Sequence, residues 1–200
     1  MVSAKYSYLY FGLIFSVLFL TFVPNAAADS AKEQLQATID RVIEVLRTIQ
    51  SPEDIERNRN SLRRILLTRF DFAAMAEKSL GNRWKDLEDK EEEFVSVFTD
   101  FVEHSYMSTL GSYRGEKVVY DRDRANGASA EVDTRVVGGE GNPIKIGYKL
   151  HLTDGQWMVY DAVIDDVGLV ANYRSQFARI LQTVSLGELI ENLRGKASGR

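Results

Sequence analysis

The sequence offers few residues that could carry out covalent chemistry. It contains no cysteine and only two histidines, His104 on an expected helix and His151 on the polar face of an expected strand. Without cysteine there is no thiol nucleophile, no disulfide and no cysteine-rich zinc site, and no second histidine accompanies either one at ligand spacing. The glycine cluster at 138–142 joins two expected strands and opens no helix, so it is not a phosphate-binding loop. We expect no metal and no cofactor.

Asp161 is the one residue whose surroundings raise the question of catalysis. It interrupts an apolar strand pattern between Val159 and Val163. A carboxyl group among apolar side chains can serve an enzyme as general acid or base. It can equally accept a hydrogen bond from Tyr148, Arg174 or a backbone amide and order the sheet. No second catalytic residue accompanies it, so we favour the structural role. A small-substrate enzyme that uses Asp161 as its base is the alternative function.

Composition and charge limit the possible functions further. The chain has 200 residues, of which 44% are hydrophobic and 27% are charged. These proportions are typical of a globular protein with a core of its own. The formal net charge is -4, and no run of lysine and arginine is interleaved with aromatic residues. We therefore expect no nucleic-acid partner.

The first 28 residues have the composition of an export signal. Lys5 is followed by an apolar stretch from Leu9 to Val23, then by Pro24 and the small residues Ala26 to Ala28. This order is typical of a secretory signal peptide. An uncleaved anchor helix is the other possibility, but the apolar core is shorter than the about 20 residues that a spanning helix needs. We predict cleavage near Ala28 and a mature protein, residues 29–200, that works outside the cytoplasm.

Helical patterns occupy both ends of this mature chain. Capping signals, in which a serine or aspartate precedes an apolar periodic segment, predict helices that begin at Ser30, Ser51, Asp71 and Ser185. Apolar residues at three- and four-residue steps predict two further helices, over 89–113 and 169–181. These positions place helices on both sides of a central region that has a different pattern.

The central region predicts an antiparallel sheet, because apolar and polar residues alternate strictly along it. Its strands are expected near 118–120, 128–136, 144–152 and 156–164. Asp154-Gly155 is a two-residue hairpin turn, which fixes the register of the last two strands. The expected cross-strand pairs are Leu152 with Trp157, Leu150 with Val159, Tyr148 with Asp161, and Ile146 with Val163. One face of the sheet is then an apolar wall.

The predicted fold class is therefore α+β, with helices packed on a curved antiparallel sheet. Periodicity does not tell a filled interior from a hollow one, since both have the same apolar pattern. The residue pattern alone favours a filled core. A structural adaptor with a dry interior and no ligand is thus a further alternative.

A resemblance to a known family favours a hollow interior over a filled core. It extends from about Ser51 to Leu181 and depends on the order and spacing of many residues. They are Phe70, Asp71, Phe72, Met75, Leu80, Gly81, Trp84, Phe94, Phe98, Tyr106, Tyr113, Gly115, Glu116, Lys117, Val118, Pro143, Ile144, Tyr148, Gly155, Trp157, Val159, Tyr160, Asp161, Leu169, Asn172, Tyr173, Arg174, Gln176 and Phe177. In this respect the chain resembles the periplasmic phospholipid carriers of the MlaC type, the toluene-tolerance family.

One segment departs from the family pattern. Between the last strand and the next helix, members tend to have an acid, a glycine, an aliphatic residue and a serine, whereas this chain has Asp165, Asp166, Val167 and Gly168. Without the serine, we expect Asp166 to cap the helix. The departure leaves the fold unaffected and the head-group preference open.

The resemblance implies a cone related to nuclear transport factor 2, with a small helical subdomain beside it. Residues 51–88 would form that subdomain, 89–182 the cone with its sheet, and 183–200 the C-terminal helix and tail. The implied function is binding of glycerophospholipid acyl chains in an apolar cavity, with the phospholipid as cargo and no catalysis. The implied partners are an outer-membrane lipoprotein–porin complex and an inner-membrane ABC transporter with its lipid-binding periplasmic subunit. Such carriers maintain the lipid asymmetry of the outer membrane.

The resemblance also leads us to assign lipid-binding residues on the expected cavity wall. These are Phe72, Met75, Trp84, Phe98, Val102, Tyr106, Tyr148, Leu150, Trp157, Val159, Val163, Val167, Val170 and Tyr173.

Overall fold

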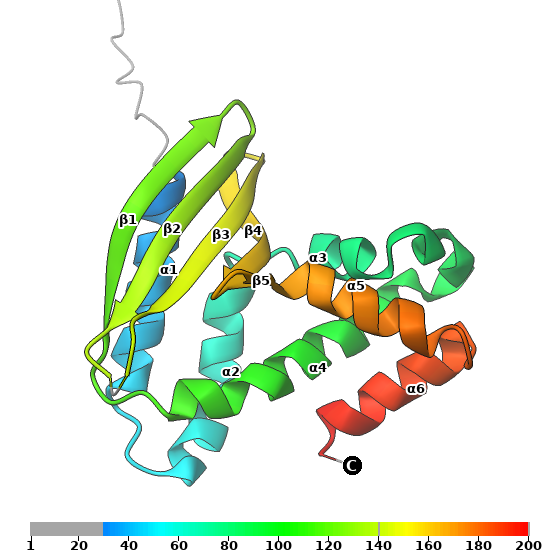
Figure 1. The fold of residues 1–200 in the computed structure, drawn as a ribbon. Helices are drawn as coiled ribbons and strands as arrows, with labels where there is room; N and C mark the ends of the chain where they lie inside the picture. The colour runs from blue at the N-terminus through cyan, green and yellow to red at the C-terminus, as the bar shows by residue number, and fades with distance from the viewer. Residues whose placement is uncertain (1–29, 140, 200) are drawn as a thin grey trace, which may run out of the picture.

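The computed structural model describes residues 30–139 and 141–199. The predicted signal peptide, residues 1–28, lies outside the described residues. Within the described part the fold is α+β, as the sequence predicts, with a five-stranded antiparallel sheet in the order β1-β2-β3-β4-β5 (Figure 1). The helices are α1 (Ala31–Leu46), α2 (Pro52–Leu67), α3 (Phe72–Leu80), the 3-10 helix η1 (Gly81–Lys90), α4 (Glu91–Gly111), α5 (Leu169–Ile180) and α6 (Leu186–Ala197). The strands are β1 (Lys117–Asn126), β2 (Ser129–Val137), β3 (Ile144–Thr153), β4 (Gln156–Ile164) and β5 (Val167–Gly168).

The capping signals in the sequence correctly mark where four helices begin. Complete capping boxes, in which side chain and backbone satisfy each other, precede α1, α2 and α6. At α3, the Asp71 side chain accepts a hydrogen bond of 2.9 Å from the backbone N–H of Ala74. Each cap pairs backbone groups that a helix start leaves free, and so fixes the residue at which the helix begins.

The strand register agrees with the prediction near the hairpin and differs beyond it. Leu152 pairs with Trp157 and Leu150 with Val159, as expected. A β-bulge then leaves Tyr160 without a partner on β3. The predicted pairs with Asp161 and Val163 are therefore wrong: the structure pairs Tyr148 with Ala162, Lys149 with Asp161, Gly147 with Val163 and Ile146 with Ile164.

The bulge matters because one extra residue moves every later side chain to the other face of the sheet. Ala162 and Ile164 join the apolar face, which we call the inner face. Asp161 and Val163 move to the opposite, outer face, across from Lys149 and Gly147. The apolar wall therefore has no carboxylate in its middle.

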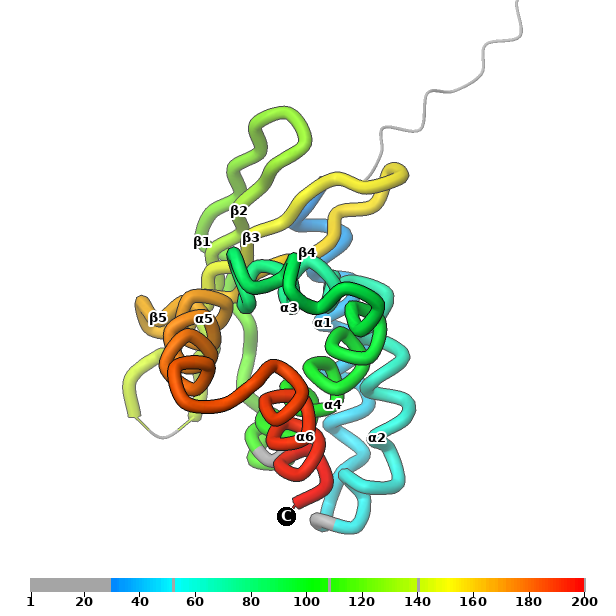
Figure 2. Tube along the Cα trace, turned by 90° about the vertical axis from the view of Figure 1, so that its right-hand side faces the viewer, coloured from blue at the N-terminus to red at the C-terminus, as the bar shows by residue number. Residues whose placement is uncertain are grey.

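Helices gather at two places around the sheet. α1 lies along the inner face, with α2 beside it, whereas α3, α5 and α6 gather beyond β5 (Figures 1 and 2). The long helix α4 extends from that helical group to the end of the sheet where β1 begins (Figure 1). It thus takes part in two different packing regions.

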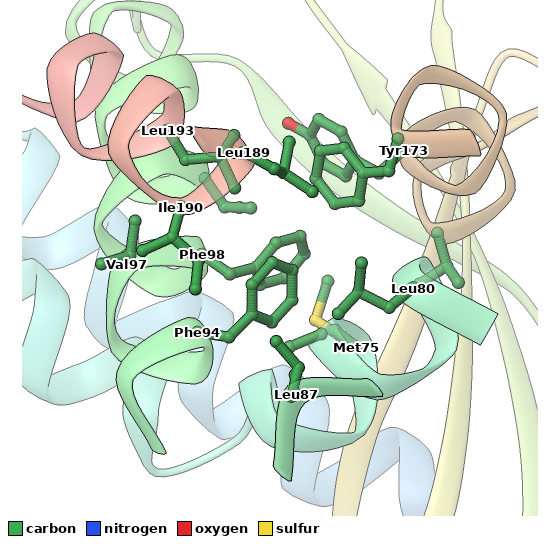
Figure 3. Packing of buried hydrophobic residues seen from close by; sticks show 14 of the residues in the cluster. Met75, Leu80, Leu87, Phe94, Val97, Phe98, Tyr173, Leu189, Ile190 and Leu193 are labelled. Atoms are coloured by element: carbon green, nitrogen blue, oxygen red, sulfur yellow. The ribbon is translucent and has the colours of Figure 1, made fainter. Parts of the chain in front are cut away.

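The buried apolar residues form three clusters that follow this arrangement. The helical core joins α3, η1, α4, α5 and α6, and its aromatic side chains converge in Figure 3. A second cluster packs α1 against one half of the inner face, with Leu35 opposite Leu150 and Val159. A third joins the ends of α1, α2 and α4. The other half of the inner face is not covered by any of these clusters.

Candidate functional site

An apolar cavity of about 530 Å³ lies against the uncovered half of the inner face. Its volume is in the range of about 300–1,000 Å³ that ligand pockets have. The residues that line it come from all the surrounding elements. From the helices and their connections they are Thr38, Ile39, Val42, Ile43, Leu46, Arg63, Leu66, Phe70, Phe72, Met75, Thr99, Val102, Glu103, Tyr106, Met107, Thr109, Leu110, Ser112, Tyr113, Glu116 and Leu169. From the sheet they are Val118, Val136, Ile144, Ile146, Tyr148, Ala162 and Ile164.

The cavity exists because α1 and α4 meet the sheet only in part. The first half of α1 packs directly on the wall through Ala31 and Leu35. Its second half, from Ile39 to Leu46, faces the cavity together with α4. The strands contribute mainly valine and isoleucine, whose branched side chains suit a pleated, half-buried surface.

The mouth of the cavity is marked by the lining residues that solvent reaches. Thr109 and Ser112, at the C-terminal end of α4, are exposed, and so is Ile144 at the start of β3, with 44% of its surface accessible. The opening therefore lies between the end of α4 and the beginning of β3. An amphiphile with its apolar part inside would present its polar part here.

A group of ion pairs around the buried Glu103 lies at one side of the cavity, between α2 and α4. Arg63 contacts Glu103 and also donates a hydrogen bond of 2.6 Å to Asp100. Only 6% of the Glu103 side chain is exposed, and Arg59 lies 3.5 Å from its second oxygen. The charges on this wall are thus compensated, and a charged group buried in an apolar surface needs such compensation.

Tyr148 brings a phenol to the cavity without bringing a charge. Desolvation raises the pKa of Tyr148 to about 12. The hydroxyl is therefore protonated at neutral pH, and the sheet side of the cavity stays uncharged.

The structure brings five of the fourteen assigned lipid-binding residues to the cavity. They are Phe72, Met75, Val102, Tyr106 and Tyr148. Their contact with lipid remains a prediction.

The other nine assigned residues do not line this cavity, for three physical reasons. Four fill the helical core: Trp84, Phe98, Val170 and Tyr173. Three lie beneath α1 in the filled half of the sheet: Leu150, Trp157 and Val159. Val163 is turned to the outer face by the bulge, and Val167 is 57% exposed.

Sequence reasoning misses most of the lining residues, because the apolar faces on which they lie fit a filled core equally well. The second half of α1 contributes Ile39, Val42, Ile43 and Leu46, which the 3.6-residue period reveals but does not place. On the sheet, Val136, Ile144 and Ile146 follow the strict alternation of β2 and β3. The alternation correctly predicts which face of the sheet is apolar. It does not predict which half of that face stays uncovered, because this depends on where α1 packs.

Asp161 has a structural role. It is 6% exposed, accepts a hydrogen bond of 3.1 Å from the backbone N–H of Val170 and lies 3.1 Å from the Lys149 ammonium. Arg174 instead donates to the carbonyl of Lys78. The expectation that Asp166 caps the next helix is wrong. Gly168 is the N-cap of α5 and supplies no side chain, so Asp161 provides the acceptor from β4.

Asp161→Ala is expected to lower the free energy of unfolding by about 2 kcal/mol, because a buried backbone N–H of α5 loses its acceptor. Asp161→Asn is expected to cost less, since its amide oxygen can still accept from Val170. Chemical denaturation of both variants measures the difference. Equal destabilisation by alanine and asparagine would contradict this role.

Within residues 30–139 and 141–199, no group of three or more histidine, aspartate or glutamate side chains is arranged to hold a metal ion. In the same part of the chain, none of the helices combines the length and the apolar character needed to cross a bilayer.

The chain is similar to known proteins in sequence and in fold. The family described as "MlaC protein" matches residues 36–195. The "Intermembrane phospholipid transport system binding protein MlaC" of Haemophilus influenzae is 25% identical over 197 residues, which cover 90% of this chain and 91% of the relative. A solved phospholipid-binding protein from Ralstonia solanacearum, in complex with a phospholipid, superposes with a TM-score of 0.74 at 22% identity, over 86% of this chain and 98% of that chain. At that identity the structural likeness concerns the fold.

Proposed function

Because the chain belongs to the MlaC family, we propose that it is a periplasmic carrier that binds the acyl chains of a glycerophospholipid in the cavity beside the inner face. The observation that carries the proposal is an apolar cavity of about 530 Å³ whose exposed lining residues lie at the end of α4 and the start of β3. Such a shape suits an amphiphile whose tails are buried while its head stays near solvent.

The physical chemistry of lipids makes such a carrier necessary. Two acyl chains with roughly 30 methylenes, at about 0.8 kcal/mol each, would lose about 24 kcal/mol on entering water. This exceeds the strongest non-covalent affinities, about 18 to 21 kcal/mol, so free lipid cannot cross an aqueous gap at a useful rate. A carrier exchanges one apolar environment for another, which keeps the net free-energy change small.

The name of the Haemophilus relative, an intermembrane transport component, supports a place between two membranes. We propose that residues 1–28 direct export and are removed near Ala28, and that residues 51–88, 89–182 and 183–200 form the helical subdomain, the cone and the C-terminal part. The proposed partners are an outer-membrane lipoprotein–porin complex and an inner-membrane ABC transporter with its lipid-binding periplasmic subunit. The proposed role is to keep the outer membrane asymmetric.

The enzyme alternative finds little support. Asp161, its candidate base, is engaged by a backbone amide and a lysine, and it lies on the face of the sheet away from the cavity. We propose that the bound phospholipid leaves the protein chemically unchanged.

The proposal is tested by two measurements on one preparation. Protein purified from the periplasm is examined by native mass spectrometry, and its lipid is then extracted and identified. The same protein is mixed with donor vesicles that contain a labelled phospholipid and with unlabelled acceptor vesicles. We expect stoichiometric lipid and faster transfer with more protein; a lipid-free protein that leaves the transfer rate unchanged would refute the carrier function.

A further inference from the structure

The mouth of the cavity has an unusual charge composition for a site that would take a phosphate-bearing head group. Phosphate sites commonly use arginine or lysine. Among the described residues that line the cavity, Arg63 is the only cation, and it is paired with Glu103 and Asp100 on the wall between α2 and α4. The mouth itself has the hydroxyl-bearing residues Thr109 and Ser112.

Glu116 is the charged residue that lines the cavity at this end. It follows α4 and precedes β1, beside the turn between β2 and β3. One of its carboxylate oxygens accepts a hydrogen bond of 2.7 Å from the backbone N–H of Arg114. The other lies 3.2 Å from the position that a Cβ on Gly139 would take. These neighbours fix the position of the carboxylate beside the turn between β2 and β3.

The carboxylate is ionised at neutral pH, and the Arg114 guanidinium, whose positive charge acts on it, forms no salt bridge with it. The backbone N–H of Arg114 holds the pKa of Glu116 below its ordinary value, so the group is negatively charged at neutral pH. Among the described residues, no lysine, arginine or histidine lies within 4 Å of it. The nearby Arg114 guanidinium donates to the carbonyls of Gly111 and Tyr113, at the C-terminal end of α4, and is not part of the lining.

We infer that Glu116 selects the head group, and that the carrier prefers a phospholipid with a primary ammonium, such as phosphatidylethanolamine, over an anionic one such as phosphatidylglycerol. The inference rests on the proposed function. Both lipids carry the same phosphate, so the phosphate itself gives no preference between them. Only the ethanolamine head adds a cation, whose N–H donors can bind the carboxylate, whereas with the glycerol head the phosphate and the carboxylate repel each other as like charges.

The expected preference is modest because the mouth is open to water. Ion pairs at exposed positions are worth up to about 1 kcal/mol, which corresponds to about a fivefold ratio at most. We expect an enrichment of about threefold, smaller at high salt because mobile ions screen the interaction.

The test is a competition between two lipids with matched acyl chains. Delipidated protein is loaded from vesicles that contain dioleoyl phosphatidylethanolamine and dioleoyl phosphatidylglycerol in equal amounts, and the bound lipids are quantified by mass spectrometry. Glu116→Gln keeps an oxygen for the Arg114 N–H but removes the charge, and Glu116→Lys reverses it. Asp166→Asn removes an exposed acid that faces the outer side of the sheet, and is the matched control.

We expect the wild type and Asp166→Asn to be enriched in phosphatidylethanolamine by about threefold, Glu116→Gln to bind both lipids equally, and Glu116→Lys to favour phosphatidylglycerol. The total lipid bound should be the same in all four proteins. Equal binding by the wild type, or an unchanged ratio in Glu116→Gln, would overturn the inference while leaving the carrier function intact. Absence of lipid from every protein would overturn the carrier function itself.

Discussion

Ile146→Trp is expected to reduce the phospholipid that co-purifies with the protein by at least about tenfold, while the fold is retained. Ile146 lies on β3, pairs with Ile164 and faces the cavity. Tryptophan adds about six non-hydrogen atoms, and each methylene it displaces from the cavity costs about 0.8 kcal/mol. Displacement of only two methylenes exceeds the roughly 1.4 kcal/mol that corresponds to a tenfold loss. Lipid extraction followed by mass spectrometry measures the change.

Val163→Trp is the matched control, because Val163 is on the neighbouring strand with its side chain on the outer face. Its partner Gly147 has no side chain, so the surface has room for the indole. We expect its lipid content to equal that of the wild type. If Val163→Trp empties the protein and Ile146→Trp does not, the assignment of the two faces is wrong.

Phe98→Ala is expected to lower the free energy of unfolding by about 3–5 kcal/mol, the usual cost of removing a buried phenyl ring. Phe98 is 0% exposed, and its ring lies 5.6 Å from that of Tyr173 and 6.1 Å from that of Phe94. The resulting void would lie in the helical core, where five helical elements meet. For a chain of this length the melting temperature should fall by about 10 °C. Calorimetry or thermal circular dichroism measures it.

The Phe98→Ala variant also tests whether Phe98 has a structural role or a lipid-binding role. Phe98 does not line the cavity, so Phe98→Ala at a temperature where it is folded should hold as much phospholipid as the wild type. Phe98→Leu should recover part of the lost stability, because it refills part of the void. A folded Phe98→Ala protein that has lost its lipid would place Phe98 on the binding surface instead.

Local patterns predicted the elements because each depends on a few neighbouring residues. The capping boxes at Ser30, Ser51 and Ser185 satisfy backbone groups within three residues, so they can be recognised without tertiary information. β1 is longer than the expected segment 118–120 and extends to Asn126. Its charged second half showed no apolar alternation, and it is ordered by pairing with β2.

The bulge at Tyr160 could not be predicted, because the alternation of β4 is apolar on both sides. Met158 and Tyr160 on one side are as apolar as Trp157 and Val159 on the other, so the pattern gives no sign of the extra residue. The faces that Asp161 and the residues after it occupy depend on this one position.

The division of the interior into filled and hollow parts also cannot be predicted from the sequence. α4 carries one continuous apolar pattern, but its Phe98 points into the helical core while Val102 and Tyr106 border the cavity. Which part of the pattern is covered depends on where α1, α5 and α6 lie. Periodicity identifies an apolar face; only the tertiary arrangement says what packs against it.

In the proposed carrier, acyl chains occupy the space between α4 and the hollow half of the inner face. The most direct measurement is a crystal structure of the protein loaded with a phospholipid whose chains carry bromine, which anomalous scattering locates. We predict bromine positions in contact with Ile146, Tyr106 and Val42, and a head group at the end of α4. Bromine found only on the outer face, or side chains that close this space in the loaded protein, would show that this cavity does not hold the acyl chains.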